Sequence, residues 1–368
     1  MREPETCAIC HEPYPADQLI EFEDELYCSS CLGIETVVCS RCGRRVWNSD
    51  NAGTDEFPLC ESCYEDHYVN CTSCGRLIRT DDAYYDDFDD DSPYCRDCHA
   101  QHDNSAIHNY YFKPVPVFYG TGNRFFGVEL EVDGAGEYDE NAECAVYTAN
   151  INGREHIYCK HDGSLEEGFE IVTHPMTLEY HIDKMPWERL LAKVKAMGYT
   201  SHQAQTCGLH IHVNRVSLGD TDNNRDACIA RILYIFEKFW DELLKFSRRT
   251  SRQLERWAAR YGYKESPKDI LDHAKKGTCS GRYTCVNLEN RDTIEFRMFR
   301  GTLKLNTLIA TLQLVNRVCD VALSLSDDDV KAMSWTTFVS GCTEPELVQY
   351  LKERRLYIND PVTCEEDI

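Results

Sequence analysis

The sequence lacks long apolar runs, and this absence excludes one class of protein. No stretch of about 18 apolar residues occurs in its 368 residues, so we expect no membrane-spanning helix. The opening residues MREPETCAIC have neither a basic start nor an apolar segment, so we expect no signal peptide. The hydrophobic content of 42% is ordinary for a folded protein and argues against wholesale disorder.

Positive charge is also scarce, above all in the first third. No lysine precedes Lys113, and residues 1–112 hold seven arginines against twenty-four acids. The whole chain has 39 basic and 63 acidic residues, for a net charge of -24. Because affinity for nucleic acid comes mainly from clustered lysine and arginine, we expect no nucleic-acid partner. An acidic surface for a cationic partner and a merely solvated surface both fit this N-terminal charge.

Cysteine is abundant, and its spacing indicates metal rather than disulfides. Twelve of the 21 cysteines form six C-x-x-C pairs within residues 7–98, and the other nine are scattered. A reducing, cytoplasmic location fits this pattern best.

The paired cysteines belong to three copies of one unit, which we call zinc modules: residues 1–34, 35–66 and 67–104. The opening pairs recur every 32 residues, and 17, 17 or 20 residues separate each from its closing pair. Four thiolates at this spacing predict one closed, structural, tetrahedral zinc site per module, of treble-clef or zinc-ribbon type. The predicted zinc ligands are Cys7, Cys10, Cys28, Cys31, Cys39, Cys42, Cys60, Cys63, Cys71, Cys74, Cys95 and Cys98.

A linker over residues 105–122 leads to a domain over 123–330, whose strands carry polar side chains at alternate positions. In GVELEVD, period 2 places Glu129 and Glu131 on one face, and CGLHIHVN does the same for His210 and His212. TIEFRMFRG adds Glu295 and Arg297, and GFEIVTHP adds Glu170. One such strand alone is more often a half-solvated edge, but four together gather ligands for Mg²⁺ or Mn²⁺.

Several arginines accompany these acids. They are Arg248, Arg249 and Arg252 in SRRTSRQ, Arg282 in SGRYTCVNL, and Arg297 and Arg300. Metal ions with arginines suit phosphoryl transfer, which depends on positioning and charge neutralisation. No G-x-x-x-x-G-K-[ST] or G-x-G-x-x-G motif occurs, so Walker and Rossmann nucleotide sites are not expected.

The ordered set GVELEVD, DGSLEEGFEIVTHP, CGLHIHVN and TIEFRMFRGT, over about residues 123–320, resembles the amidoligases. These are carboxylate–amine ligases of the superfamily of glutamine synthetase and γ-glutamylcysteine ligase. The resemblance implies an α+β, glutamine synthetase-like domain with a curved antiparallel sheet and packed helices, preceded here by the three zinc modules. A C-terminal helical extension and tail would fill residues 331–368.

The resemblance also implies roles for individual residues. Glu131 and Glu170 would hold one Mg²⁺ or Mn²⁺, and Glu129, His210 and Glu295 a second. The remaining candidates contact substrate or nucleotide: His212, Arg248 and Arg252 at ATP, Arg297 and Arg300 at the transferred phosphoryl group, Arg282 at phosphates or a substrate carboxylate, and Asp162 near the amine as a base.

The expected function is therefore an ATP-dependent ligase that joins a carboxylate to an amine through an acyl phosphate. Appended zinc modules suit recruitment of a macromolecule, so we expect a peptide or protein substrate together with an amine donor. A guanidino-kinase-like phosphotransferase and a zinc-module adaptor with an inactive ligase domain are the alternatives. The sequence does not define the oligomeric state.

Two helices and one cap are predicted outside these motifs. Apolar residues at helical spacing predict one helix over 222–247 and another over 307–324. Thr343 and Glu346 predict a capping box before a short helix, and the tail TCEEDI is expected to be loose.

Overall fold

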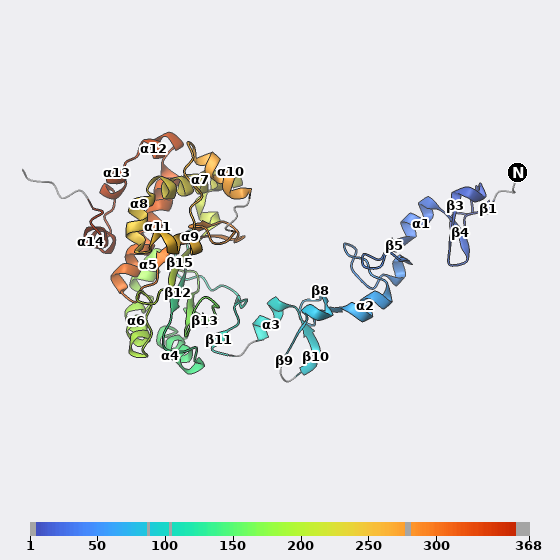
Figure 1. The fold of residues 1–368 in the computed structure, drawn as a ribbon, viewed down its shortest axis with the longest axis horizontal. Coiled ribbons are helices and arrows are strands. Elements are labelled where there is room, and N and C mark those ends of the chain that lie inside the picture. The colour runs from blue at the N-terminus through green and yellow to red at the C-terminus, as the bar shows by residue number, and fades with distance from the viewer. Residues whose placement is uncertain (1–4, 87–88, 103–104, 277–280, 358–368) are drawn as a thin grey trace, which may run out of the picture. The chain divides into compact units, whose positions relative to one another are not determined.

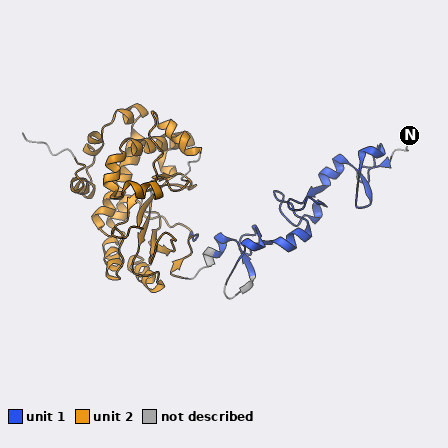
Figure 2. Ribbon diagram, viewed as in Figure 1, with its two compact units in different colours: residues 1–103, 111–113 blue, residues 104–110, 114–368 orange. Residues whose placement is uncertain are grey.

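The computed structural model describes residues 5–86, 89–102, 105–276 and 281–357. The chain forms two compact units, shown in Figure 2, and each is described by itself. Unit 1 comprises residues 1–103 and 111–113, and unit 2 comprises residues 104–110 and 114–368. Within the described residues, no helix is both long enough and apolar enough to cross a bilayer.

Unit 1 contains the three zinc modules, each built from short hairpins followed by one helix (Figure 1). The first has β1 (Glu5–Thr6), β2 (Pro13–Tyr14), β3 (Leu19–Phe22), β4 (Glu25–Cys28) and α1 (Ser29–Glu35). The second has β5 (Thr36–Val38), β6 (Arg45–Trp47) and α2 (Glu61–His67). The third has β7 (Tyr68–Asn70), β8 (Leu77–Arg79), β9 (Tyr84–Asp86), β10 (Asp89–Tyr94) and α3 (Arg96–His102). Each helix begins directly after the first cysteine of a closing pair.

The opening C-x-x-C of every module makes the same tight turn. The residue after its second cysteine has a positive φ: 59° at His11, 75° at Gly43 and 70° at Gly75. The amide of that residue donates to the carbonyl of the first cysteine, at 2.8 to 2.9 Å. Glycine adopts this left-handed conformation without strain, which explains its presence in two of the three turns.

Unit 2 is built on a seven-stranded sheet in the order β11-β13-β14-β12-β15-β17-β16. The strands are β11 (Ile107–His108), β12 (Phe126–Val132), β13 (Ile157–Lys160), β14 (Phe169–Thr173), β15 (Gly208–Asn214), β16 (Val286–Asn287) and β17 (Thr293–Arg300). All neighbours pair antiparallel except β11 with β13, which pair parallel. The α+β class with an antiparallel sheet is therefore confirmed.

One face of this sheet is apolar and packs on helices. Val128, Leu209 and Phe296 are fully buried on it, and Phe236 of α7 lies 5.5 Å from Phe296 between ring centroids. The described helices of unit 2 of eight or more residues are α4 (Asp139–Ala149), α6 (Trp187–Ala196), α7 (Asp222–Lys238), α8 (Trp240–Ser247), α10 (Pro267–Lys275), α11 (Leu305–Ser324) and α14 (Pro345–Glu353). The shorter ones are α5 (Leu178–Asp183), α9 (Ser251–Trp257), α12 (Asp327–Ala332) and α13 (Trp335–Ser340). Burial of the apolar face leaves the opposite face for chemistry.

Two local predictions are wrong. The expected single helix over 222–247 is interrupted at Phe239, whose φ of -105° and ψ of 33° are not helical, and it continues as α8. The capping box of Thr343 and Glu346 does not form, because α14 starts one position later with Glu344 as its N-cap and Pro345 as its first residue. Proline suits the first position of a helix because the amide N–H that it lacks would have no partner within the helix there. The tail TCEEDI lies outside the described residues.

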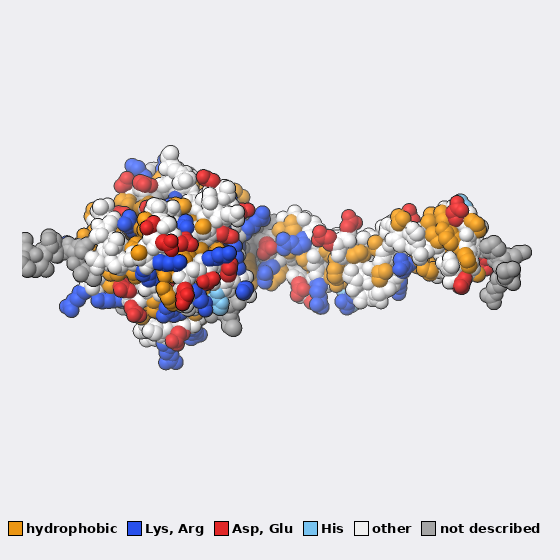
Figure 3. All heavy atoms as spheres, turned by 90° about the horizontal axis from the view of Figure 1, so that it is seen from above, with side chains coloured by type: hydrophobic (Ala, Val, Ile, Leu, Met, Phe, Trp, Pro, Cys, Tyr) orange, Lys and Arg blue, Asp and Glu red, His pale blue; other side chains and the backbone are white. Residues whose placement is uncertain are grey.

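The surface of unit 2 carries charge of both signs. Acidic and basic side chains are interspersed over the face seen in Figure 3.

Candidate functional site

The twelve paired cysteines converge into three groups of four. Within each group, the four sulfur atoms all lie within 4.8 Å of one another. Such sets of four thiolates fit tetrahedral zinc and leave no open position for water. The fold thus brings together the same three groups of four cysteines that the spacing predicts.

In each module, backbone amides lower the pKa of the first cysteine of the opening pair, while the pKa of the last cysteine is raised to about 12. Burial would raise the pKa of Cys7, but the amides of Cys10, Cys28 and Ile9 outweigh burial and lower that pKa to about 6. The same balance lowers the pKa of Cys39 and of Cys71 to about 6. Since a thiolate is the metal-binding form, these amides favour metal binding at neutral pH.

In unit 2, the polar face of the sheet assembles a carboxylate cluster, which we define as Glu129, Glu131, Glu170, His210, His212 and Glu295. Strand register explains the assembly. Glu131 lies opposite Glu170 on β14, Glu129 lies opposite His210 on β15, and His212 lies opposite Glu295 on β17. Four neighbouring strands therefore supply all six side chains to one face.

The distances within the carboxylate cluster are those of potential ligands. His210 Nδ1 lies 3.3 Å from a Glu129 oxygen and 3.7 Å from a Glu295 oxygen, and His210 Nε2 lies 3.6 Å from Glu131. His212 Nε2 lies 3.1 Å from the other Glu129 oxygen. Two of the groups that could hold a cation are Glu129 with Glu170 and His210, and Glu129 with His212 and Glu295. His212 can therefore act as a ligand, besides the role at ATP that the resemblance implies.

Electrostatics divides the four carboxylates into two pairs. Burial raises the pKa of Glu131 and raises that of Glu170 well above its ordinary value, with Glu129 adding to the rise at Glu170. At Glu129 and Glu295, burial is again the largest single cause and acts in the same direction, but His212 and His210, with Arg297 at Glu295, together outweigh it and lower both pKa values. The Glu131 and Glu170 pair thus holds negative charge that the protein compensates poorly. Divalent cations with oxygen ligands would compensate it.

Three further predicted residues lie around the carboxylate cluster. Arg297 pairs with Glu295, and its guanidinium lies 5.9 Å from the Tyr283 ring centroid. Arg282 donates to the hydroxyls of Tyr110 and Tyr283, the latter at 2.9 Å. Asp162 is close enough to contribute, after burial, to the raised pKa of both Glu131 and Glu170. These three residues therefore lie at the edge of the cluster.

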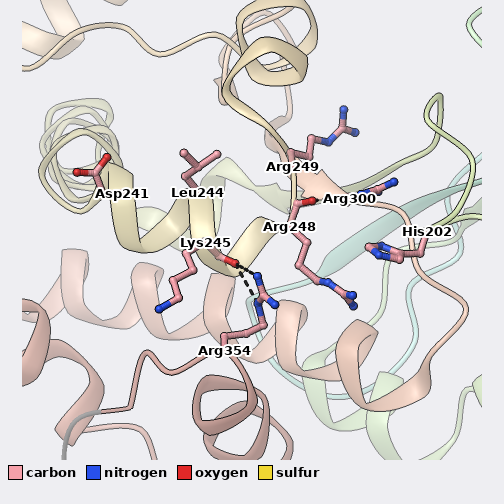
Figure 4. A pocket seen from close by; sticks show the side chains of 8 residues that line it. All are labelled: His202, Asp241, Leu244, Lys245, Arg248, Arg249, Arg300 and Arg354. Atoms are coloured by element: carbon pink, nitrogen blue, oxygen red, sulfur yellow. Dashed lines mark hydrogen bonds between the residues drawn. The ribbon is translucent and has the colours of Figure 1, made fainter.

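The other predicted arginines lie elsewhere. Arg248 and Arg300 line a separate cavity of about 440 Å³, which we call the basic pocket. Its lining residues are His202, Asp241, Leu244, Lys245, Arg248, Arg249, Arg300 and Arg354 (Figure 4). Arg252 is exposed on α9 and belongs neither to the carboxylate cluster nor to the lining of the basic pocket.

The fold also places residues at the carboxylate cluster that the sequence patterns did not select. Lys160 is buried opposite Glu170 on β13, and the amides of Asn287 and Asn290 donate to Glu295 at 2.8 and 3.2 Å. Lys160 precedes Asp162 by two residues in a strand that alternates like the others, so the same period would have found it. The asparagines lie in and beyond a strand of only two residues, which has no detectable period.

Gly208, the first residue of β15, lies close to residues of both the carboxylate cluster and the basic pocket. Glu131 accepts a hydrogen bond from the Gly208 amide. A Cβ atom at Gly208 would lie 2.6 Å from Arg249 Nη2 and 2.7 Å from His210 Nε2. Arg249, which lines the basic pocket, thus approaches the carboxylate cluster where only glycine fits. An anion in the pocket and cations at the cluster would be neighbours.

Of the comparisons with known proteins, the family match alone bears on this chemistry. Residues 149–319 match the family model described as "putative amidoligase enzyme". No curated protein matches the chain. A bifunctional glutathione synthetase from Pasteurella multocida is 15% identical with a TM-score of 0.32, over 63% of this chain and 46% of its own. A "novel glutamine synthase homolog" is 12% identical with a TM-score of 0.31, over 63% of this chain and 64% of its own. Scores this low carry no functional argument. On the family match, residues 149–319 are similar to the amidoligase family.

Proposed function

We propose that the protein is an ATP-dependent ligase that forms an amide bond between a carboxylate and an amine. The observation that carries the proposal is the carboxylate cluster, in which four acids and two histidines converge on one face beside Arg297. Hard oxygen ligands with imidazole suit Mg²⁺ or Mn²⁺, and the poorly compensated charge of Glu131 and Glu170 supports such cations. Bound there, they would neutralise phosphate charge.

The chain's own residues would then act in two steps. In the first, Arg297 and the cluster orient ATP while an oxygen of the acid attacks the γ-phosphorus, which gives an acyl phosphate and releases ADP. In the second, Asp162 takes a proton from the amine as its nitrogen attacks the acyl carbon, and inorganic phosphate leaves. Arg282 would hold the nucleotide phosphates or a substrate carboxylate.

We assign the zinc modules a structural and recruiting role. Each would hold one zinc through four thiolates, and units this small bury too little apolar surface to fold without metal. A peptide or protein substrate suits such an appendage. The spacing of the cysteines, typical of metal sites and not of a disulfide framework, supports a reducing, cytoplasmic location.

Release of ADP tests the proposal. The full chain with Mg²⁺, ATP and panels of acids and amines should release ADP and form a product heavier by the amine less water. Glu129→Ala and Glu295→Ala should reduce turnover by at least a hundredfold, because each removes a ligand that contacts both histidines or the arginine. Glu188→Ala, an exposed change on α6, is the matched control. Unchanged turnover in both cluster variants would refute the assignment.

Mass spectrometry separates the two alternatives. A guanidino-kinase-like phosphotransferase would leave a phosphorylated product and no amide. An adaptor with an inactive ligase domain would bind nucleotide without turnover on any substrate. The complete set of acids, histidines and Arg297 argues against the second alternative.

A further inference from the structure

The basic pocket concentrates positive charge in a protein whose net charge is -24. Four arginines and one lysine line it, against the single carboxylate of Asp241. Among the described residues, none of these five cations forms an ion pair with a carboxylate. Like charges held together without a partner repel one another, so the pocket is suited to an anion.

Backbone carbonyls hold the cations in place. Arg354 donates to the Lys245 carbonyl at 3.1 and 2.8 Å, the bonds drawn dashed in Figure 4. Lys245 Nζ donates to the Arg355 carbonyl at 3.2 Å, and Arg249 Nε to that of Phe299 at 3.2 Å. These bonds orient the side chains without cancelling their charge. The pocket is therefore organised in advance for a ligand, which reduces the entropy lost on binding.

The surrounding groups respond to this field. Burial, followed by Arg248, Arg300 and Arg354, lowers the pKa of His202 to about 4, so this imidazole is neutral at pH 7. Burial and then Arg248 lower the pKa of Arg300. Burial is the larger cause of both pKa shifts, and the neighbouring arginines add to it; a bound anion would offset the part that the arginines contribute.

The lining disfavours a nucleotide as the ligand. Leu244 is its one aliphatic side chain, and it has no phenylalanine, tyrosine or tryptophan on which a base could stack. A triphosphate usually arrives with Mg²⁺, which binds carboxylates, and four of these lie in the carboxylate cluster. ATP therefore suits the cluster, and the pocket suits an anion that carries no metal.

Arg249 relates the pocket to the reaction. Arg249 lines the pocket. A Cβ atom added at Gly208 would be too close both to Arg249 Nη2 and to His210 Nε2, so these two groups lie near each other. Arg249 is thus the one described lining residue of the pocket shown to lie close to the carboxylate cluster. Arginine forks match carboxylates in pairs of hydrogen bonds.

We propose that the basic pocket binds further carboxylates of the acid substrate, so that the substrate is a polycarboxylate such as a short acidic peptide segment. This inference rests on the proposed function and narrows its substrate class. The pocket volume of about 440 Å³ is in the usual range for specific ligand sites.

Binding of a fluorescein-labelled peptide of four glutamates to the full chain, followed by anisotropy without ATP or Mg²⁺, tests the inference. Arg354→Gln and Lys245→Gln should each weaken binding about tenfold to a hundredfold, because each removes a charge-assisted contact. Arg189→Gln removes the same charge from the exposed face of α6 and should leave binding within about twofold. Asp241→Asn removes the one repelling carboxylate and should tighten binding severalfold, which a purely structural role of the pocket would not produce.

Three results would overturn the inference. The first is equal binding of a peptide of four glutamines. The second is no binding of the glutamate peptide while tripolyphosphate protects the chain from thermal unfolding, which would make the pocket a phosphate site. The third is amide formation from a monocarboxylate at a rate that Arg354→Gln leaves unchanged, which would keep the ligase proposal. Conversely, peptide binding that depends on Arg354, with no turnover of any acid, would keep the pocket and reject the ligase.

Discussion

Replacing Glu170 with glutamine should stabilise the protein when no divalent cation is bound, although Glu170 is placed for function. Its carboxylate is buried, opposite Glu131, and its pKa is raised well above the ordinary value by burial first and then by Glu129, with Lys160 opposing the rise. At any pH above the ordinary pKa of glutamate, about 4.3, the unfolded chain then binds fewer protons than the folded one. Stability is thereby lost as pH rises, until the folded pKa is reached. A glutamine has no such loss.

The size of the effect has an upper limit. One proton lost on unfolding changes the free energy of unfolding by about 1.4 kcal/mol per pH unit. pH 7 lies about 2.7 units above the ordinary pKa of glutamate, so the gain in Glu170→Gln is at most about 4 kcal/mol. With roughly 2–4 °C per kcal/mol for a unit of this size, Tm should rise by several degrees at pH 7. Near pH 4 the two proteins should melt together.

Tryptophan fluorescence during thermal unfolding, in a mild chelator, measures this difference, since four of the five tryptophans lie in unit 2. Glu237→Gln is the matched control. Glu237 is as deeply buried, but it accepts from Arg260 at 2.9 Å and from the Tyr261 amide at 2.7 Å. Loss of these charge-assisted bonds should destabilise that variant by about 1–3 kcal/mol.

Adding Mg²⁺ should reverse the order of stability of the wild type and Glu170→Gln. The wild type should gain stability on adding Mg²⁺, because the ion binds the folded state only, whereas Glu170→Gln should gain less. A Glu170→Gln protein that is less stable than the wild type at pH 7 without cations would refute the electrostatic reasoning. So would a stability difference that does not shrink toward pH 4.

Three further predictions concern the metals and the junction between the sites. A mild chelator should abolish ADP release reversibly, with Mg²⁺ restoring it, while about three zinc ions per chain remain bound; loss of zinc in step with activity would contradict separate sites. Replacing Cys39 and Cys42 with serine should reduce bound zinc by about one per chain and weaken substrate recruitment. ATP binding by residues 123–320 should persist in that protein, and its loss would mean that the modules help to build the active site. Gly208→Ala should lower ADP release by about a hundredfold, since its Cβ would displace Arg249 or His210, whereas Gly163→Ala, with its nearest atom at 3.9 Å, should not.

The sequence by itself singled out the members of the three cysteine groups and most members of the carboxylate cluster. Fixed spacing was enough for the cysteines, because the repeat places each opening pair at one turn and each closing pair at one helix start. Strict alternation was enough for Glu129, Glu131, Glu170, His210 and Glu295, because side chains two apart in a strand must share a face. Those rules are local; that the four strands are neighbours, and so bring these side chains to one face, follows only from the strand pairing.

The tertiary structure alone decided where the arginines lie. Simple alternation along β17 would place Phe299 with Glu295 and Arg297, and Arg300 with the core. Instead a register shift lets Leu209 pair with Phe299 and Gly208 with Arg300, so Phe299 is buried and Arg300 turns to the polar side. Such a bulge depends on how two strands distant in sequence pair, which no local pattern reports.

The basic pocket shows the same limit over a longer range. Its cations come from the end of β17, from α8 and the residues after it, and from Arg354 at the end of α14. They are far apart in the sequence and follow no common period. Only the packing of those helices against the sheet brings five positive charges around one cavity, because charge adds up in space and not along the chain.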